Sequence, residues 1–407
     1  MNFEGDNMMD VKRKNRSAAL RTLHEMGAMS RKRLAEHMKL TPAAITKIVS
    51  EMIEDGIVRE GTVLSHGGAG RREILVEINE QAGCTLGIFI HLRQAILSAV
   101  RLDGSVLFSE TLALEERAPA EKTVKHLCTR LMTLVHKQGL KNEEILGVGV
   151  AVRGTTTLDA QSVRNSHGAL DTEYYPLRER VEHYTHLPTV MANNVRALFA
   201  AQLFLSRDTD LPSQFFLRCE YGIGASMTIN NEVWRGCSAQ CAEIGHIPVI
   251  KRGGKPCSCG KSGCLETIAA PGAIREEALA ICSPEKTPLL YQRLEGRDVE
   301  ELTLEDVLEA AAQGDAAIAS IVEHAVTALG QALKSVIYLV DPKKIVLYGR
   351  LFENNYYLAK LFSEMQEGVD AGHMVMIEKS RYNLALDECA APLLAVRAFF
   401  NRGGMPA

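Results

Sequence analysis

The sequence predicts an α/β protein that consists of an N-terminal winged helix-turn-helix followed by a larger body of two α/β lobes. Two short helical patterns joined by a capped turn lie near the N-terminus, and a glycine-rich hairpin follows them. From Cys84 onward, apolar strand patterns alternate with helical ones. We place the domains at residues 1–80, at 81–194 with about 383–407 for the smaller lobe, and at 195–382 for the larger lobe.

Length and composition are those of an ordinary globular protein with several domains. The chain has 407 residues, which is more than one hydrophobic core usually supports. No run approaches the roughly 18 apolar residues of a membrane span, and the N-terminus lacks the apolar segment of a signal peptide. We therefore expect a cytoplasmic protein without membrane insertion. Its ten cysteines should stay reduced and act as metal ligands or core residues.

The charge of the chain is unevenly distributed. The net charge is -4, yet the segment from Val11 to Lys47 holds ten Lys or Arg residues and two acidic ones. The whole molecule is therefore not a general binder of polyanions. A basic patch of this kind indicates a local surface for nucleic acid.

Three helices are predicted before residue 56. The first carries apolar residues at helical spacing and ends at Gly27. Ser30 caps a second helix over Arg31–Met38, and Thr41 caps a third over about Pro42–Glu54, with proline at the first helical position. Two helices joined this way place the second one in the major groove of DNA.

A β-hairpin wing is predicted from residue 57 to residue 78. Its strands, 57–60 and 74–78, flank the glycine-rich tip 66–72. We favour contact of the tip arginines with the minor groove over a merely solvated basic hairpin. The residues expected at the DNA are Ser30, Arg31, Arg33, Thr41, Ala43, Thr46, Lys47, Arg71 and Arg72.

The body is predicted as two lobes of alternating strands and helices. In the first lobe the expected strands are 85–90, 95–103, 145–152 and 187–192, and the expected helices are 119–138 and 195–204. The second lobe begins near Ser213, with strands 214–219, 225–229 and 344–349 and a long helix at about 316–339.

A structural zinc site is the most specific chemical prediction. His246, Cys257, Cys259 and Cys264 offer one imidazole and three thiolates, a complete tetrahedral set with no position open for an activated water. Three inert buried cysteines or a catalytic zinc are the alternatives that this crowding argues against. We interpret Cys237 as a core residue, and Cys241 likewise.

A histidine bound to zinc through one ring nitrogen keeps its other N–H as an oriented donor. With the carboxylates of Glu243 and Glu266, that donor could hold the hydroxyls of a sugar. The alternative is that both glutamates are ordinary surface acids.

From about Val11 to Phe400 the chain resembles the ROK family of repressors, open reading frames and kinases, and its DNA-binding members in particular. The motifs that carry the resemblance are residues 40–47, residues 243–246 and residues 257–270. The resemblance implies an actin-like body with a sugar in the cleft between the lobes and zinc bracing one side. It assigns the sugar-binding role to Gly154, Asn193, Asn194, Glu243, His246 and Glu266.

Two departures from the family's kinases argue against an enzyme. Asn194 stands where the kinases have the aspartate that deprotonates the sugar, and an amide cannot accept that proton. Residues 88–95 are bulky and free of glycine where the phosphate loop of the kinases should lie. A third departure is Arg153 before Gly154, which could signal an acidic or phosphorylated sugar or simply form an ion pair.

The leading hypothesis is a sugar-responsive transcriptional regulator, most simply a homodimeric repressor that grips an inverted-repeat operator. The larger lobe would carry the dimer interface, and a dimer of dimers is the alternative assembly. One competitor is an active sugar kinase that carries a DNA-binding domain. Another is a regulator controlled by a partner, such as a sugar-transport protein, or by zinc itself.

Overall fold

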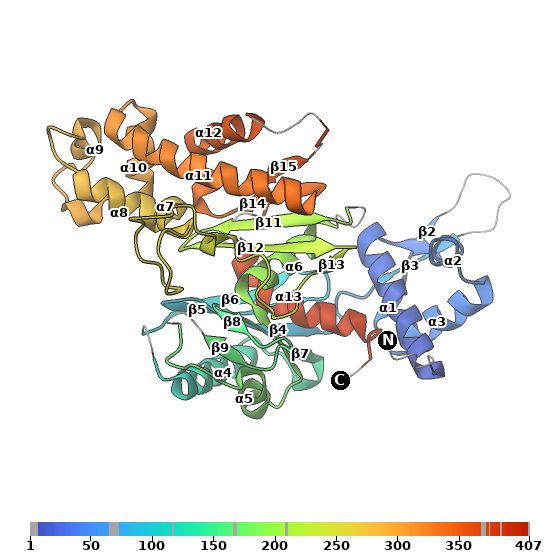
Figure 1. The fold of residues 1–407 in the computed structure, drawn as a ribbon. Coiled ribbons are helices and arrows are strands. Elements are labelled where there is room, and N and C mark those ends of the chain that lie inside the picture. Colours follow the sequence, from blue (N-terminus) through green and yellow to red (C-terminus); the bar gives the residue numbers. More distant parts are fainter. Residues whose placement is uncertain are drawn as a thin grey trace. The chain divides into compact units, whose positions relative to one another are not determined.

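The computed structural model describes residues 7–64, 73–115, 118–165, 169–207, 211–367, 372–373, 375–382 and 385–405 (Figure 1). The chain forms two compact units. Unit 1 comprises Met1–Thr209 and Ala385–Ala407, and unit 2 comprises Asp210–Leu384.

Unit 1 begins with the predicted winged helix-turn-helix. Its elements are α1 (Met8–Met26), β1 (Met29–Ser30), α2 (Arg31–Met38), α3 (Pro42–Glu54), β2 (Val58–Leu64) and β3 (Glu73–Ile78). The three strands form one antiparallel sheet in the order β1-β3-β2. Gly27, at φ 78°, ends α1 as expected. Leu23 and His24 in the last turn of α1 are buried, whereas Met26, the final residue of the helix, is 54% exposed.

A five-stranded mixed sheet forms the centre of the lobe that follows. Its strands are β4 (Cys84–Ile90), β5 (Gln94–Arg101), β6 (Val106–Ala113), β7 (Ile145–Val152) and β10 (Thr189–Asn193), in the order β10-β7-β4-β5-β6. β4, β5 and β6 are antiparallel, whereas β7 runs parallel to β4 and β10 parallel to β7. A short antiparallel pair, β8 (Thr155–Thr156) and β9 (Val163–Asn165), leaves the end of β7.

Helices cover both faces of this sheet. Apolar residues of α4 (Ala120–Lys137) and α5 (Leu177–Thr185) form a core with one face of β4, β5 and β7. On the other face lies α13 (Ala385–Asn401), with α6 (Asn194–Ser206) packed beside it (Figure 1). Gly149 permits the close approach of α13, because a Cβ atom there would lie 1.8 Å from the Ala391 carbonyl oxygen.

A hydroxyl from the sheet that α13 covers replaces the hydrogen bond that the proline inside this helix cannot donate. Pro392 has no N–H to donate to the Glu388 carbonyl one turn earlier. The Ser98 hydroxyl of β5 donates to that carbonyl at 2.6 Å instead. The Thr85 hydroxyl of β4 donates to the Pro392 carbonyl at 2.9 Å. These bonds fix α13 on the sheet.

Unit 2 is a second mixed α/β lobe. Its strands are β11 (Gln214–Cys219), β12 (Ile223–Ile229), β13 (Glu232–Val233), β14 (Lys344–Tyr348) and β15 (Met376–Lys379), in the order β13-β12-β11-β14-β15. Its helices are α7 (Glu266–Ala269), α8 (Pro271–Ile281), α9 (Pro288–Gln292), α10 (Leu304–Ala312), α11 (Ala316–Val340) and α12 (Asn355–Gln366). The winged helix and two mixed α/β lobes confirm the predicted fold class.

Among the residues described, α11 is long and apolar enough to cross a membrane by length and composition. Half of its most apolar stretch is buried, and Ile318, Leu329 and Leu333 belong to the core of unit 2. Such burial is the pattern of the central helix of a folded domain.

Candidate functional site

The N-terminal half of α3 presents a polar face to solvent. The Thr41 side chain accepts a hydrogen bond from the Ala44 amide at 3.3 Å and so caps the helix. Ile45, Ile48 and Val49 face the core. Thr41, Ala43, Thr46 and Lys47 are exposed, as the recognition-helix prediction requires. This arrangement leaves four small or cationic side chains able to enter a groove of DNA.

The predicted residues of α2 divide into two kinds. Ser30 is 3% exposed, and its hydroxyl caps α2 by accepting from the Arg33 amide at 3.4 Å and donates to Glu73 at 2.7 Å. Its side chain therefore holds the domain together. Arg33 is exposed, whereas Arg31 is paired with Glu60 at 2.9 Å. Arg71 and Arg72, predicted at the wing tip, lie outside the described residues.

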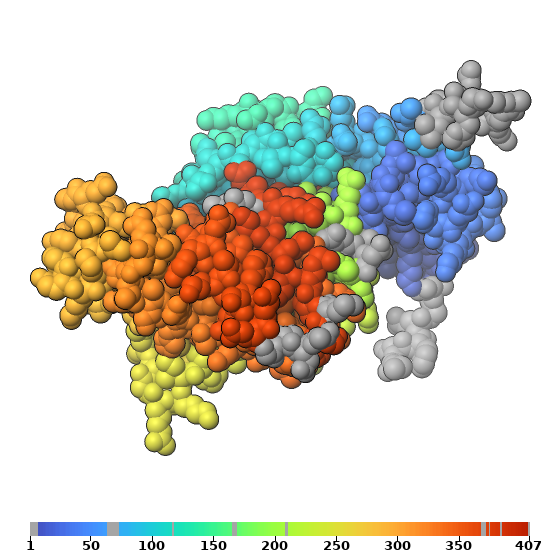
Figure 2. All heavy atoms as spheres, turned by 90° about the horizontal axis from the view of Figure 1, so that it is seen from above, coloured from blue at the N-terminus to red at the C-terminus, as the bar shows by residue number. Residues whose placement is uncertain are grey.

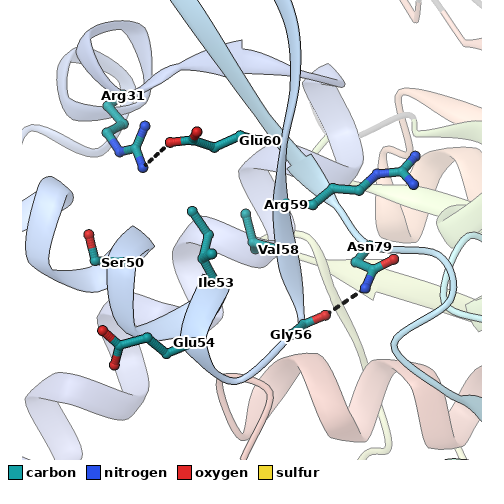
Figure 3. Close-up of a pocket in the computed structure, with 9 residues that line it drawn as sticks. All are labelled: Arg31, Ser50, Ile53, Glu54, Gly56, Val58, Arg59, Glu60 and Asn79. Carbon is teal, nitrogen blue, oxygen red and sulfur yellow. Dashed lines mark hydrogen bonds and ion pairs between the residues drawn. The ribbon is translucent and has the colours of Figure 1, made fainter.

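A pocket of about 590 Å³ lies behind the second half of α3 (Figure 3). Ile53 and Val58 are its apolar residues, and the Arg31–Glu60 pair stands at one side of it. The two glutamates of the lining, Glu54 and Glu60, are balanced by two arginines, Arg31 and Arg59, so its side chains carry no net charge. The lining residues are Arg31, Ser50, Ile53, Glu54, Gly56, Val58, Arg59, Glu60 and Asn79.

In unit 1 the structure brings together three of the predicted sugar-binding residues. The Asn193 side chain accepts from the amides of Val195 and Arg196 and so caps α6, while its Nδ2 donates to the Gly154 carbonyl at 2.6 Å. Asn194, the first residue of α6, is 5% exposed. Gly154 has a φ of 109°, which a residue with a side chain rarely adopts. The strand-to-helix junction thus places two amides beside a glycine turn.

Bulky side chains occupy the end of β4, where the resemblance puts the phosphate loop of the kinases. The His91 amide donates to the Gln94 carbonyl at 2.8 Å, so this N–H is not available to a phosphate. The His91 ring is buried, with Nε2 3.5 Å from Asp387 in the first turn of α13. Sequence reasoning did not single out Asp387, since nothing local in the sequence marks a partner that distant in the chain.

In unit 2 the four predicted zinc ligands converge. Their ligand atoms all lie within 4.8 Å of one another. The Cys257 Sγ lies 3.4 Å from His246 Nδ1, and the Cys259 Sγ lies 3.6 Å from the Cys264 Sγ. His246 ends the short 3-10 turn η2 (Ile244–His246), and Figure 2 shows the yellow segment around residue 250 projecting from the surface of the unit.

These distances fit a tetrahedral zinc ion. Zn–S bonds of about 2.3 Å and Zn–N bonds of about 2.0–2.1 Å give tetrahedral edges of about 3.8 Å and about 3.6 Å. Burial, followed by the neighbouring thiols, raises the pKa of Cys264 to about 12. Three ionised thiols in such contact therefore need a cation. Cys237, expected in the core, is exposed, because its loop lies outside the packed apolar cluster.

Of the two predicted carboxylates of unit 2, that of Glu266 is held by a backbone amide. Glu266 Oε2 accepts from the Ile223 amide at 3.0 Å, and a side chain at Gly222 would collide with it at 2.3 Å. The Glu243 carbonyl accepts from the His246 amide at 3.1 Å, so this glutamate lies one short turn from the zinc cluster. The sequence analysis did not predict that position 222 requires glycine. The glycine-containing turn 221–224 is the sequence feature that could have indicated it.

Comparisons with known proteins agree with this arrangement. The model of the ROK family matches residues 94–383, and that of the MarR family matches residues 15–60. The DNA-binding transcriptional dual regulator NagC of Escherichia coli K12 is 28% identical over 345 residues, 84% of this chain and 82% of that protein. The DNA-binding transcriptional repressor Mlc of the same strain is 25% identical over 340 residues, 83% of this chain and 81% of Mlc.

Among solved structures, a ROK family transcriptional regulator described as a homologue of the Escherichia coli Mlc protein superimposes with a TM-score of 0.78. The two chains are 22% identical, and the match covers 97% of each. The shared fold therefore includes the N-terminal domain as well as both lobes.

Proposed function

Because the chain belongs to the ROK family, we propose that it is a transcriptional regulator whose winged helix binds duplex DNA and whose body binds a sugar or sugar derivative as effector. The observation that carries this proposal is the exposed N-terminal half of α3, joined in one chain to a body with the family's sugar and zinc motifs. NagC and Mlc, which are described as DNA-binding transcriptional regulators, match 84% and 83% of this chain and support the proposal.

The DNA contacts follow from the charge of the winged helix. Lys47 and Arg33 are exposed cations, Thr46 and Ala43 are short enough for close approach to base edges, and the tip arginines would reach the minor groove. Two such domains in a homodimer would match the two halves of an inverted repeat. Repression of carbohydrate-use genes in the cytoplasm is the simplest outcome, and a dimer of dimers would bind two such repeats.

The effector would be held by hydroxyl-directed hydrogen bonds. Asn193 and Asn194 supply amides beside Gly154, and Glu243, His246 and Glu266 supply two carboxylates and a ring N–H. His246, Cys257, Cys259 and Cys264 would hold zinc, which braces the loop and orients the His246 ring.

The body should bind without turning over its ligand. Asn194 offers an amide where a base would be needed, and loss of general-base catalysis costs about a hundredfold or more. At the end of β4 the His91 ring fills space, and its amide is engaged within the turn. Both features support an effector-binding body over a sugar kinase with a DNA-binding domain.

Selection of duplexes from a randomised library by the full chain tests the proposal. We expect an enriched inverted repeat, with Lys47→Ala weakening binding to it about tenfold or more. Lys125→Ala, which removes an exposed lysine from α4 in the lobe, is the matched control and should leave affinity within about twofold. Failure to enrich any sequence, together with ATP-dependent phosphorylation of a hexose, would favour the kinase alternative.

A further inference from the structure

The DNA-binding domain is seated on the lobe of unit 1 through a buried histidine. His24 of α1 is 9% exposed, and its Nε2 lies 2.8 Å from the Phe204 carbonyl oxygen in the last turn of α6. A carbonyl oxygen only accepts, so Nε2 donates. The His24 ring also stacks on the Phe204 ring at 3.8 Å between centroids, and Phe400 of α13 contacts it edge-on at 6.0 Å. One side chain of α1 therefore contacts both helices.

A buried arginine of α1 makes a second connection between the DNA-binding domain and the lobe. Arg16 of α1 is 2% exposed; its Nε donates to the Gly403 carbonyl at 2.8 Å and its Nη2 to Asp55 at 2.6 Å. Asp55 is the C-cap of α3, and Gly403 follows α13. Arg16 thus ties α1 to the end of the recognition helix and to the end of α13, and Arg21 adds a bond to Asn401 at 2.7 Å.

α6 begins at the candidate ligand residues of this unit, and the first turn of α13 lies at the end of β4. Asn193 caps α6 and bonds the Gly154 carbonyl. Asp387, in the first turn of α13, lies 3.5 Å from His91 at the end of β4. Nearly all of α6 is buried, and its 13 residues span about 20 Å. Two packed helices therefore connect these residues to α1.

We infer that α6 and α13 form the coupling element between the ligand-binding end of the lobe and the DNA-binding domain, with His24 and Arg16 as the residues that position that domain. When a ligand contacts Asn193 and shifts it, the N-terminus of α6 moves with it. Because α6 is packed on nearly all sides, it moves as a rigid body, and the displacement reaches Phe204 in its last turn. The inference rests on the proposed function for its effect on DNA affinity, but the coupling itself exists without DNA.

Amide hydrogen exchange on the full chain, without DNA or sugar, tests the coupling. Asn193→Ala removes the cap of α6, and we expect exchange in the α1 segment 17–26 to accelerate about three- to tenfold. Asn354→Ala is the matched control, because Asn354 caps α12 in unit 2 and likewise donates its amide, to Glu305. Asn354→Ala should leave the rate of amide exchange in the α1 segment within about twofold of the wild-type rate.

A second control separates coupling from general loss of stability. Val124→Ala weakens the core on the α4 face of the same lobe, where Val124 is buried away from α6. At matched global stability it should accelerate α1 exchange less than Asn193→Ala does. Equal acceleration by these two variants, or none in Asn193→Ala, would overturn the inference.

A double-mutant cycle assigns the transmission to His24. His24→Phe keeps a stacking ring and removes the donor, whereas His24→Gln keeps a donor and removes the ring. Sites about 20 Å apart normally contribute independently, so the effects of Asn193→Ala and His24→Phe should multiply if they are uncoupled. We expect Asn193→Ala to accelerate exchange in α1 by less than about twofold once His24→Phe is present. In the His24→Gln background, part of the acceleration by Asn193→Ala should return. Simple multiplication would contradict coupling through this contact.

Discussion

Removal of the proposed zinc ion is the perturbation whose size follows most directly from the structure. The Cys259–Cys264 sulfur edge of 3.6 Å corresponds to a metal–sulfur distance of about 2.2 Å in a tetrahedron, close to the about 2.3 Å of a Zn–thiolate bond. The ligands are therefore preformed. An ion present at about a thousand times its dissociation constant stabilises the folded state by about 4 kcal/mol.

That free energy belongs to unit 2, which contains all four ligands. For a folded unit of this size, about 4 kcal/mol lowers the midpoint of thermal unfolding by about 8–16 °C. We expect this loss on exhaustive chelation and in Cys259→Ser, measured by differential scanning calorimetry. X-ray absorption of the purified protein should give three sulfur neighbours and one nitrogen neighbour for each zinc.

Cys237→Ser is the matched control for Cys259→Ser. Cys237 is an exposed thiol of the same unit outside the cluster, so its loss should leave both the melting temperature and the zinc content unchanged. Substoichiometric zinc after growth in zinc-replete medium, with identical melting of the two variants, would refute the assignment of a structural metal.

Three further outcomes are expected from the local environments of single residues. Asp55→Ala leaves the guanidinium of Arg16, which is 2% exposed, without its carboxylate partner. Because the Asp55 side chain is 49% exposed, we expect the free energy of unfolding in urea to fall by about 2–3 kcal/mol, near the lower end for buried pairs. A loss below about 1 kcal/mol would contradict the importance of this pair. Burial lowers the pKa of His24 below 6.5, so the unfolded chain takes up a proton on this ring more readily than the folded chain does. The stability that the neutral ring contributes is therefore present above pH 6.5 and falls as the pH drops below that value. His24→Phe should flatten this part of the profile of stability against pH, and an unchanged profile would contradict the reasoning. Gly222→Ala should cost about 1 kcal/mol by displacing the flexible Glu266 carboxylate from its backbone amide, which a thermal melt indistinguishable from the wild type would rule out.

Local signals in the sequence predicted the helix-turn-helix most accurately. The helices Arg31–Met38 and Pro42–Glu54 have the predicted bounds, because Ser30, Thr41 and Pro42 mark their starts chemically. Likewise, the continuous apolar run 145–152 is a strand buried in the sheet. The convergence of the four candidate zinc ligands was predicted because three of them lie within a few residues of one glycine-rich loop.

Contacts between distant segments could not be predicted in this way. Arg16 belongs to the basic patch by sequence, yet it is buried because its partner is the carbonyl of Gly403 at the other end of the chain. The strand Met29–Ser30 was missed since it exists by pairing with β3. The Asn193 side chain, which donates to the Gly154 carbonyl, was grouped with that glycine only through the family resemblance.

The most direct test of the account is a titration of DNA affinity against a panel of hexoses and their derivatives, using the duplex that the full chain selects. At least one compound should change the dissociation constant by about 5- to 150-fold, and none should be phosphorylated in the presence of ATP and magnesium. An affinity that no compound alters, combined with measurable sugar phosphorylation, would contradict a body that senses its ligand on behalf of the winged helix.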